Sequence, residues 1–185
     1  WPYGARDNLL EAHKKNPMDV NVLYYLAKAC ARSSWKEEGI AYMNKAFDMV
    51  VPTDSMMIRL YDGLLECYKF HTKADPYEKI EVMKEAYSYT KRYTLFYQIA
   101  EIYDYQKDYV NAVHYYEKYM ALVPKNKQTA LDSEGNPLPN ADTMYQKARR
   151  RVEKIKVEDF FRNGAHDDYF EPKVIRIQTK KEEVK

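Results

Sequence analysis

The chain has 185 residues, and its 30 lysines and arginines against 28 aspartates and glutamates give a formal net charge of only +2. A hydrophobic content of 45% excludes a chain that is disordered by composition, and no run of about 18 apolar residues is present to span a membrane. The balanced charge gives no reason to expect a polyanion as partner. Nineteen tyrosines and only five glycines predict a helical chain rich in aromatic side chains.

Neither the first residues nor the cysteines fix a cellular compartment. Residue 1 is Trp, and no basic segment followed by an apolar stretch opens the chain, so we expect any signal peptide to be missing already and leave the localisation undetermined. Cys30 and Cys67 each lie inside an apolar helical pattern. We expect them to be reduced, buried thiols rather than parts of a disulfide framework.

Helical patterns in the first part of the chain come in pairs. Apolar residues at helical spacing predict one helix within residues 1–17 and two within 18–52, and a proline closes each stretch. These residues are Ala5, Leu9 and Ala12, then Leu23, Leu26, Ala27 and Cys30, then Gly39, Met43 and Ala46, with Pro17 and Pro52 as the closing prolines.

Residues 53–90 repeat the pair less regularly. A first helix is predicted from the stripe that includes Leu60 and Leu64, and either Asp62 or Gly63 takes the position of a small residue. The polar segment Lys69–Pro76 predicts a longer loop before the second helix, in which Lys79 replaces a small residue.

Residues 91–124 carry the clearest pair, two predicted helices separated by the polar break 106–108. The window resembles the tetratricopeptide repeat, whose pattern is W-x2-L-G-x2-Y…A-x3-F…P over 34 residues. Tyr119 departs from it, because the family prefers a small residue there. The matching residues are Phe96, Ile99, Ala100, Tyr103, Ala112, Tyr116 and Pro124.

Two positions of the second helices keep a common register along the chain. At the first position, the residues of successive second helices are 34, 40 and 33 residues apart, and the second position has the same three intervals. A fixed register indicates stacked hairpins rather than a bundle of unrelated helices, because each large side chain needs a small residue of its neighbour beside it. The residues are Ala12, Ala46, Ala86 and Tyr119 at the first position, and Leu9, Met43, Met83 and Tyr116 at the second.

After Pro124 the pattern changes to a turn-rich loop and then a charged helix. Asp142 or Thr143 is expected to cap this helix, and Asn163-Gly164 to end it. Both features resemble the ends of bacterial multi-repeat proteins. The resemblance implies an all-α fold, a right-handed superhelix of antiparallel helical hairpins with a C-terminal capping helix. We expect one solenoid over 1–163, followed by a tail 164–185 that is extended or mobile. The parts of the solenoid are a half repeat 1–17, repeats 18–52, 53–90 and 91–124, a loop 125–140 and the capping helix 141–163.

No constellation typical of an enzyme is present in the sequence. It contains no glycine-rich phosphate loop, HExxH, CxxC or G-x-S-x-G motif, and its four histidines are dispersed. His166-Asp167-Asp168 is one adjacent run and does not form a metal-binding face. We therefore expect no enzyme activity, no cofactor and no metal.

The helix over residues 147–156 carries six basic residues against one glutamate. This cluster could bind a polyanion, but acidic residues that follow it are close enough to neutralise it, so nucleic acid is disfavoured as a partner and a solvated outer face is expected. The basic residues are Lys147, Arg149, Arg150, Arg151, Lys154 and Lys156.

Tyrosine offers the strongest indication of function. Tyr103 and Tyr116 fall at packing positions, whereas other tyrosines lie on the opposite side of the first helices and either fill space between helices or contact a partner. In the tetratricopeptide family the first helices line a concave groove, so the resemblance implies a partner-binding groove there. Its candidate residues are Tyr24, Lys28, Arg59, Tyr97, Glu101 and Tyr105.

The resemblance implies a non-enzymatic protein–protein interaction module, a scaffold or adaptor that binds a peptide or partner protein in this groove. Three alternatives stay open: polyanion binding through 147–156, a docking domain of a larger enzyme, and self-association through the half repeat at 1–17. Asn21, Lys28 and Arg59 are too sparse to predict the Lys/Asn/Arg carboxylate clamp of some family members.

Overall fold

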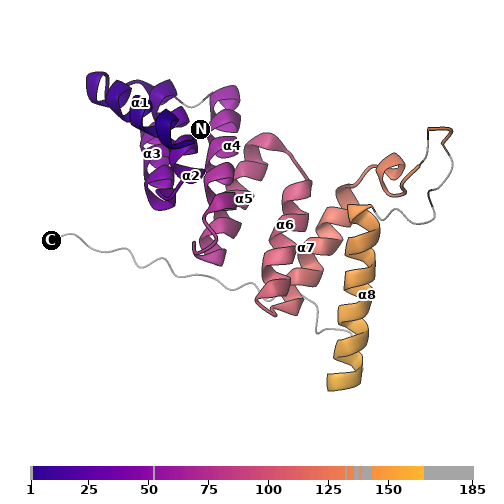
Figure 1. Ribbon diagram of the computed structural model, residues 1–185. Coiled ribbons are helices and arrows are strands. Elements are labelled where there is room, and N and C mark those ends of the chain that lie inside the picture. The colour runs from indigo at the N-terminus through magenta and orange to yellow at the C-terminus, as the bar shows by residue number, and fades with distance from the viewer. Residues whose placement is uncertain (1, 52, 132, 136–137, 139–142, 165–185) are drawn as a thin grey trace. The chain divides into compact units, whose positions relative to one another are not determined.

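The computed structural model describes residues 2–51, 53–131, 133–135, 138 and 143–164. Over these residues it contains eight α-helices, one short 3₁₀ helix and no β-strand, so the predicted all-α class is confirmed (Figure 1). The chain divides into two compact units, Trp1–Leu95 and Phe96–Lys185. Pro52 and the predicted tail from residue 165 on lie outside the described residues.

The first unit consists of five helices joined by short turns (Figure 1). α2 packs against α3 and α4 against α5 as two hairpins, while α1 contacts α2, and α4 contacts both α2 and α3. Leu9 and Leu10 of α1 are only half-buried, and self-association through residues 1–17 stays a prediction. The bounds are α1 Pro2–Lys15, α2 Val20–Ala31, α3 Lys36–Asp48, α4 Asp54–Phe70 and α5 Pro76–Thr90.

Glycines allow neighbouring helices of this unit to approach closely, as the sequence pattern predicts. A Cβ atom added at Gly39 of α3 would lie 2.9 Å from the carbonyl oxygen of Ala27 in α2. A Cβ atom at Gly63 of α4 would overlap the Met43 side chain and lie 2.7 Å from Cε2 of Tyr24. Ala27 and Met43 are fully buried, so small and large residues interlock at these contacts.

Side chains at the starts of the helices explain where they begin. The Asp19 carboxylate accepts hydrogen bonds from the amides of Asn21 (2.9 Å) and Val22 (3.2 Å) at the start of α2. Asp75 accepts one from the amide of Tyr77 (3.1 Å) at the start of α5, where Pro76 is the first helical residue. These local caps fix the first turn of each helix.

The predicted longer loop over Lys69–Pro76 is wrong at its start, because α4 continues to Phe70. α4 has 17 residues against 12 each in α2 and α6, so the extra residues of the middle repeat lengthen a helix. The buried side chains of Cys67 and Tyr68 continue the apolar stripe of α4. Lys36 Nζ donates a hydrogen bond of 2.7 Å to the carbonyl oxygen of Phe70, which stabilises the last turn.

The second unit begins within α6 and is rich in contacts between aromatic rings. Tyr97 of α6 meets Tyr116 and Tyr119 of α7 edge to face, with ring centres 5.5 and 5.3 Å apart. Tyr103 and Tyr116 are 8% and 3% exposed, so their predicted packing roles are confirmed. The bounds are α6 Thr94–Tyr105, α7 Tyr109–Leu122, the 3₁₀ helix η1 Lys125–Lys127 and α8 Met144–Asn163.

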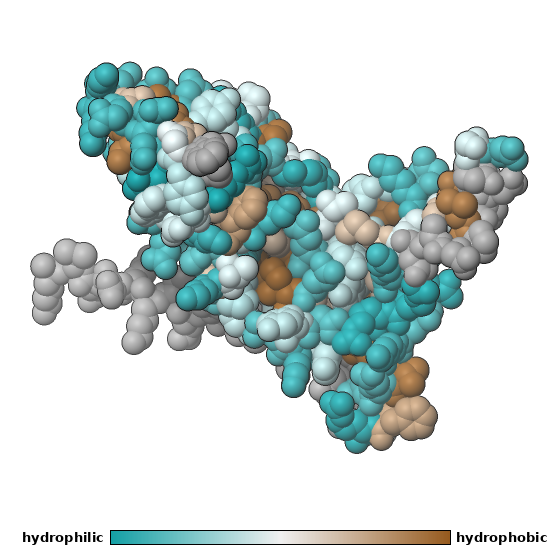
Figure 2. All heavy atoms as spheres, viewed as in Figure 1, coloured by the Kyte–Doolittle hydropathy of each residue, from teal (hydrophilic) through white to brown (hydrophobic). Residues whose placement is uncertain are grey.

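α8 begins and ends as the sequence predicts. The Thr143 hydroxyl accepts a hydrogen bond from the amide of Gln146, whose side chain accepts one from the Thr143 amide, and Gly164 follows the helix with φ 81°. Its apolar stripe is buried at Ala148, Val152 and Ile155, and α8 packs against α7. The last turns expose apolar side chains, Phe161 at 82%, and Figure 2 shows this group at the end of the helix.

Candidate functional site

Three of the six predicted groove residues lie together in the first unit, where α2 contacts α4. The guanidinium carbon of Arg59 on α4 lies 4.5 Å from the centre of the Tyr24 ring and 5.8 Å from that of Tyr25. Arg59 Nη1 also donates a hydrogen bond of 2.9 Å to Asn21 Oδ1. A cation over the face of a ring is attracted by the ring's quadrupole, so these contacts hold the guanidinium in place without neutralising it.

The third residue, Lys28, shares one carboxylate with a second cation. Lys28 Nζ lies 2.9 Å from Glu66 Oε2 and 5.2 Å from the centre of the Tyr24 ring. Arg32 Nε donates to Glu66 Oε1 at 2.6 Å. Burial alone would raise the pKa of Glu66, but the hydrogen bonds from Lys28 and Arg32 outweigh it and lower the pKa. The same hydrogen bond raises the pKa of Lys28 against the effect of its burial.

These side chains form one surface, which we name the cationic strip. Its α2 members recur every three or four residues and therefore share one face of the helix. Three cations face a single carboxylate, and no ion pair among the described residues involves Arg59, so the strip keeps an excess of about two positive charges. Its members are Asn21, Tyr24 and Lys28 of α2, Arg32 directly after that helix, and Arg59 and Glu66 of α4.

Tyr24 contributes to the strip as its floor. The side chain is only 9% exposed, because the absence of a side chain at Gly63 lets its ring lie against α4. Cations lie over the Tyr24 ring, and little of the ring is exposed. Tyr24 therefore positions these cations and offers little surface of its own to a partner.

Glu66 and Arg32 were missed by the sequence analysis, although a signal for them existed. They are 34 residues apart, which is one repeat length, so they occupy equivalent positions of successive repeats, one directly after α2 and one within α4. An acidic residue one repeat after a basic one on a first helix therefore predicts an ion pair across the two helices.

The other three predicted residues lie on α6 in the second unit. The Tyr97 hydroxyl donates a hydrogen bond to the Glu101 carboxylate, and burial followed by this negative charge raises the pKa of Tyr97 to about 12. Burial and the neighbouring Asp104 raise the pKa of Glu101, while Tyr97 and Lys147 act in the opposite direction. Tyr105 is 86% exposed and so presents nearly its whole ring to solvent. This group is aromatic and acidic.

The basic residues of α8 are largely engaged within the chain. Arg151 donates two hydrogen bonds of 2.6 Å to the Asp104 carboxylate, and Lys156 Nζ lies 2.7 Å from Glu117 Oε1. Arg149 pairs with Glu153 one helical turn away at 2.9 Å, and Lys154 Nζ lies 3.8 Å from Glu158. This charge compensation weighs against the polyanion alternative.

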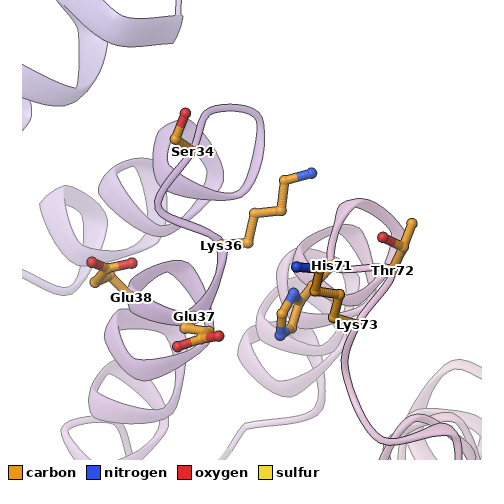
Figure 3. A pocket seen from close by; sticks show the side chains of 7 residues that line it. All are labelled: Ser34, Lys36, Glu37, Glu38, His71, Thr72 and Lys73. Atoms are coloured by element: carbon orange, nitrogen blue, oxygen red, sulfur yellow. The ribbon is translucent and has the colours of Figure 1, made fainter.

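A pocket of about 420 Å³ in the first unit has no chemistry of its own (Figure 3). The Ser34 hydroxyl contacts the Tyr3 hydroxyl at 3.2 Å, no hydrogen bond joins Ser34 to His71 among the described residues, and Lys36 Nζ donates to the carbonyl oxygen of Phe70 at the end of α4. The lining carries no nucleophile activated by a base. Its residues are Ser34, Lys36, Glu37, Glu38, His71, Thr72 and Lys73.

The described part of the chain has neither a metal-binding cluster nor a membrane-spanning helix. No three His, Cys, Asp or Glu side chains there are grouped so that they could hold a metal ion. Cys30 and Cys67 are free and buried, and burial raises the pKa of both thiols. No helix within the described ranges has the length and apolar character needed to cross a membrane.

Comparison with known proteins bears on the fold. Two crystal structures of MamA are similar to this chain. The first has a TM-score of 0.54 and 15% identity, and the match covers 86% of this chain and 85% of the MamA chain. The second has a TM-score of 0.52 and 16% identity, and covers 89% of this chain and 87% of the other. No protein-family model matches the chain, and no curated protein matches it either.

The helices and these neighbours define the fold: an all-α helical-repeat fold of the tetratricopeptide-like type. At such low identity the similarity to MamA concerns the fold alone.

Proposed function

We propose that this protein is a non-enzymatic protein–protein interaction module, a scaffold or adaptor that binds a peptide or partner protein along its first helices. The observation that carries the proposal is the cationic strip, in which Arg59 is held over Tyr24 and pairs with no carboxylate of the described residues. The helical-repeat fold supports it by analogy, since such folds present extended surfaces built from successive repeats.

The chemistry of the strip favours an acidic segment as its occupant. A guanidinium already fixed by a ring and an amide loses little conformational freedom when it binds a carboxylate. Lys28 and Arg32 share one carboxylate, so they too retain attraction for an incoming negative charge. An acidic peptide would therefore be steered to the strip and oriented by it.

In the second unit we propose that Tyr97, Glu101 and Tyr105 contact a partner as well. Tyr105 offers a large, exposed contact area at a low entropic cost, and Glu101 places a negative charge one turn before it. This surface suits the less acidic part of a partner.

The test is a selection of peptides from a random displayed library on the immobilised protein, followed by titration of the enriched peptides. We expect peptides rich in aspartate and glutamate. The double variant Arg59→Gln, Lys28→Gln should weaken their binding about tenfold or more, because it removes two charges from the strip. Glutamine leaves Tyr24 in place, so folding is separated from binding.

The matched control is Lys14→Gln, Lys15→Gln, two exposed positions at the end of α1 with the same change in charge. It should alter the affinity less than about twofold, since exposed charges away from the contact are screened. Failure to enrich any peptide, or equal binding by both double variants, would contradict the proposal.

A further inference from the structure

The first unit also has a groove between α3 and α5, which is separate from the cationic strip. It has a volume of about 340 Å³ and is floored by buried side chains of α4 that recur on one face of that helix. Half-buried Phe47 of α3 and Val82 of α5 form its walls. The floor residues are Tyr61, Leu64 and Tyr68.

The rim of this groove is acidic. Asp48 at the end of α3 and Glu78 and Glu85 on α5 line it, and no lysine, arginine or histidine does. All three carboxylates are exposed, and none forms an ion pair among the residues that the structure describes. Three negative charges thus face one opening, and no described lysine, arginine or histidine pairs with them there.

Tyrosine hydroxyls of the floor hold two of these carboxylates in position. The Tyr61 hydroxyl donates a hydrogen bond of 3.1 Å to Glu85 Oε2, and the Tyr68 hydroxyl donates one to Glu78. Burial, and then the charge of Glu85, raises the pKa of Tyr61 to about 12, so the hydroxyl keeps its proton at neutral pH. The acceptors are therefore fixed before any ligand arrives.

The groove depends on the extra length of the middle repeat. Tyr68 belongs to the last turn of α4, beyond the length that α2 and α6 reach. Tyr68 is the third residue of the groove floor, and its hydroxyl donates the hydrogen bond to Glu78.

We propose that this groove binds an arginine side chain from a partner protein. The guanidinium is planar, so it can lie against the Phe47 ring while its N–H groups reach the rim carboxylates. Charge complementarity selects a cation, and the aromatic and aliphatic walls favour the weakly hydrated guanidinium over the ammonium of lysine. The site differs from the cationic strip in both position and charge, so an acidic and a basic element could be bound at once.

The test uses two eight-residue peptides of alanine, glycine and serine, one with a central arginine and one with citrulline, its neutral isostere, in the same place. Each is titrated into the ¹⁵N-labelled protein. We expect saturable shifts of the backbone amides of Phe47, Leu64 and Val82 with the arginine peptide. The citrulline peptide should produce none, and a lysine peptide should bind several-fold more weakly.

Variants assign the effect to the rim. Glu78→Gln, Glu85→Gln should weaken the arginine peptide about fivefold or more, and Asn44→Lys, which puts a cation at the rim, should do the same. The matched control, Glu37→Gln, Glu38→Gln, changes the same charge at exposed positions of α3 and should stay within about twofold. Arg59→Gln, Lys28→Gln should leave this binding intact, which separates it from the proposed function.

Several outcomes would overturn the proposal. They are no saturable shift up to about 10 mM peptide, equal shifts with citrulline, shifts that map elsewhere, or equal losses in the control variant. Groove signals that move with protein concentration alone would assign the groove to a second copy of this chain and overturn it as well.

Discussion

Gly39 and Gly63 face different kinds of neighbour, and this difference decides the cost of a methyl group at each. At Gly39 the nearest atoms are backbone atoms of α2, which move only if the whole helix moves. At Gly63 they belong to the side chains of Met43 and Tyr24. The thioether of methionine is flexible, so this second contact can give way more easily.

We expect Gly39→Ala to lower the free energy of unfolding by about 1–2 kcal/mol, because an overpacking cost of about 2–3 kcal/mol exceeds the gain in helix propensity of about 1 kcal/mol. Gly63→Ala should cost less than half as much. Urea denaturation followed by circular dichroism measures both values. A larger loss at Gly63 than at Gly39 would show that the helix yields more readily than the side chains.

The tyrosines show how far residue-level inference reaches. Tyr103 and Tyr116 were assigned to the core by their place in the repeat, and they are buried. Tyr24 and Tyr105 were both placed on the groove side of a first helix, yet one is 9% and the other 86% exposed. Helical periodicity gives the direction of a side chain but not what the neighbouring helix places opposite it.

At the scale of the elements, one ion pair connects α8 with α6. Arg151 and Asp104 are joined by two hydrogen bonds of 2.6 Å, and their side chains are only 30% and 14% exposed. The hydrogen bonds to Asp104 raise the pKa of Arg151, against the effect of burial. By contrast, Arg149 and Glu153, both on α8, are 67% and 58% exposed.

Asp104→Asn should therefore destabilise the protein by about 1–3 kcal/mol, since it leaves a partly buried guanidinium without its counter-charge. Relief of repulsion with Glu101 offsets only part of this cost. The control Glu153→Gln removes an exposed pair and should change stability by less than about 0.5 kcal/mol. Equal effects of both variants in chemical denaturation would contradict a structural role for the Asp104 pair.

The length of α4 shows where element boundaries escape the sequence. The polar run Lys69–Pro76 predicted a loop, but the first two of its residues complete the last turn of α4. A bond from Lys36 to the carbonyl of Phe70 stabilises this turn, and the two residues are 34 positions apart. Starts of helices were easier to predict, because Thr143 caps α8 through a residue only three positions away.

For the whole molecule, a net charge of +2 conceals strong local differences. Within the first unit alone, the cationic strip carries an excess of positive charge, and the groove between α3 and α5 carries three carboxylates that form no ion pair with a described residue. The net charge gives no reason to expect a polyanion as partner, because it averages over both surfaces.

Among the described residues, each unit contains one histidine with a lowered pKa, and protonation of this histidine opposes folding in acid. Burial and then Lys45 lower the pKa of His13, and burial and then Lys118 lower that of His114. A lowered pKa means that the unfolded chain binds more protons at mildly acidic pH. The stability contributed by the neutral rings is thus fully present above pH 6.5, the ordinary value, and is lost as the pH falls through the folded-state pKa.

We expect the free energy of unfolding to decrease as the pH is lowered from 7 towards 5. The double variant His13→Gln, His114→Gln should show a flatter dependence over this range, whatever its stability at neutral pH. Denaturation series at several pH values measure the slope. A slope that is the same in both proteins would assign the dependence to carboxylates instead.

The sequence by itself determined the helical class, the paired elements, the small residues at Ala27 and Gly39, and a cap at Asp142 or Thr143. These follow from spacing and from bonds within one turn, which the local chain contains in full. The tertiary structure decided that Arg59 lies over Tyr24, that Lys28 shares Glu66 with Arg32, and that α3 and α5 leave a groove with an acidic rim. Such contacts join residues about one repeat apart, and they depend on how closely two helices pack, which periodicity alone does not fix.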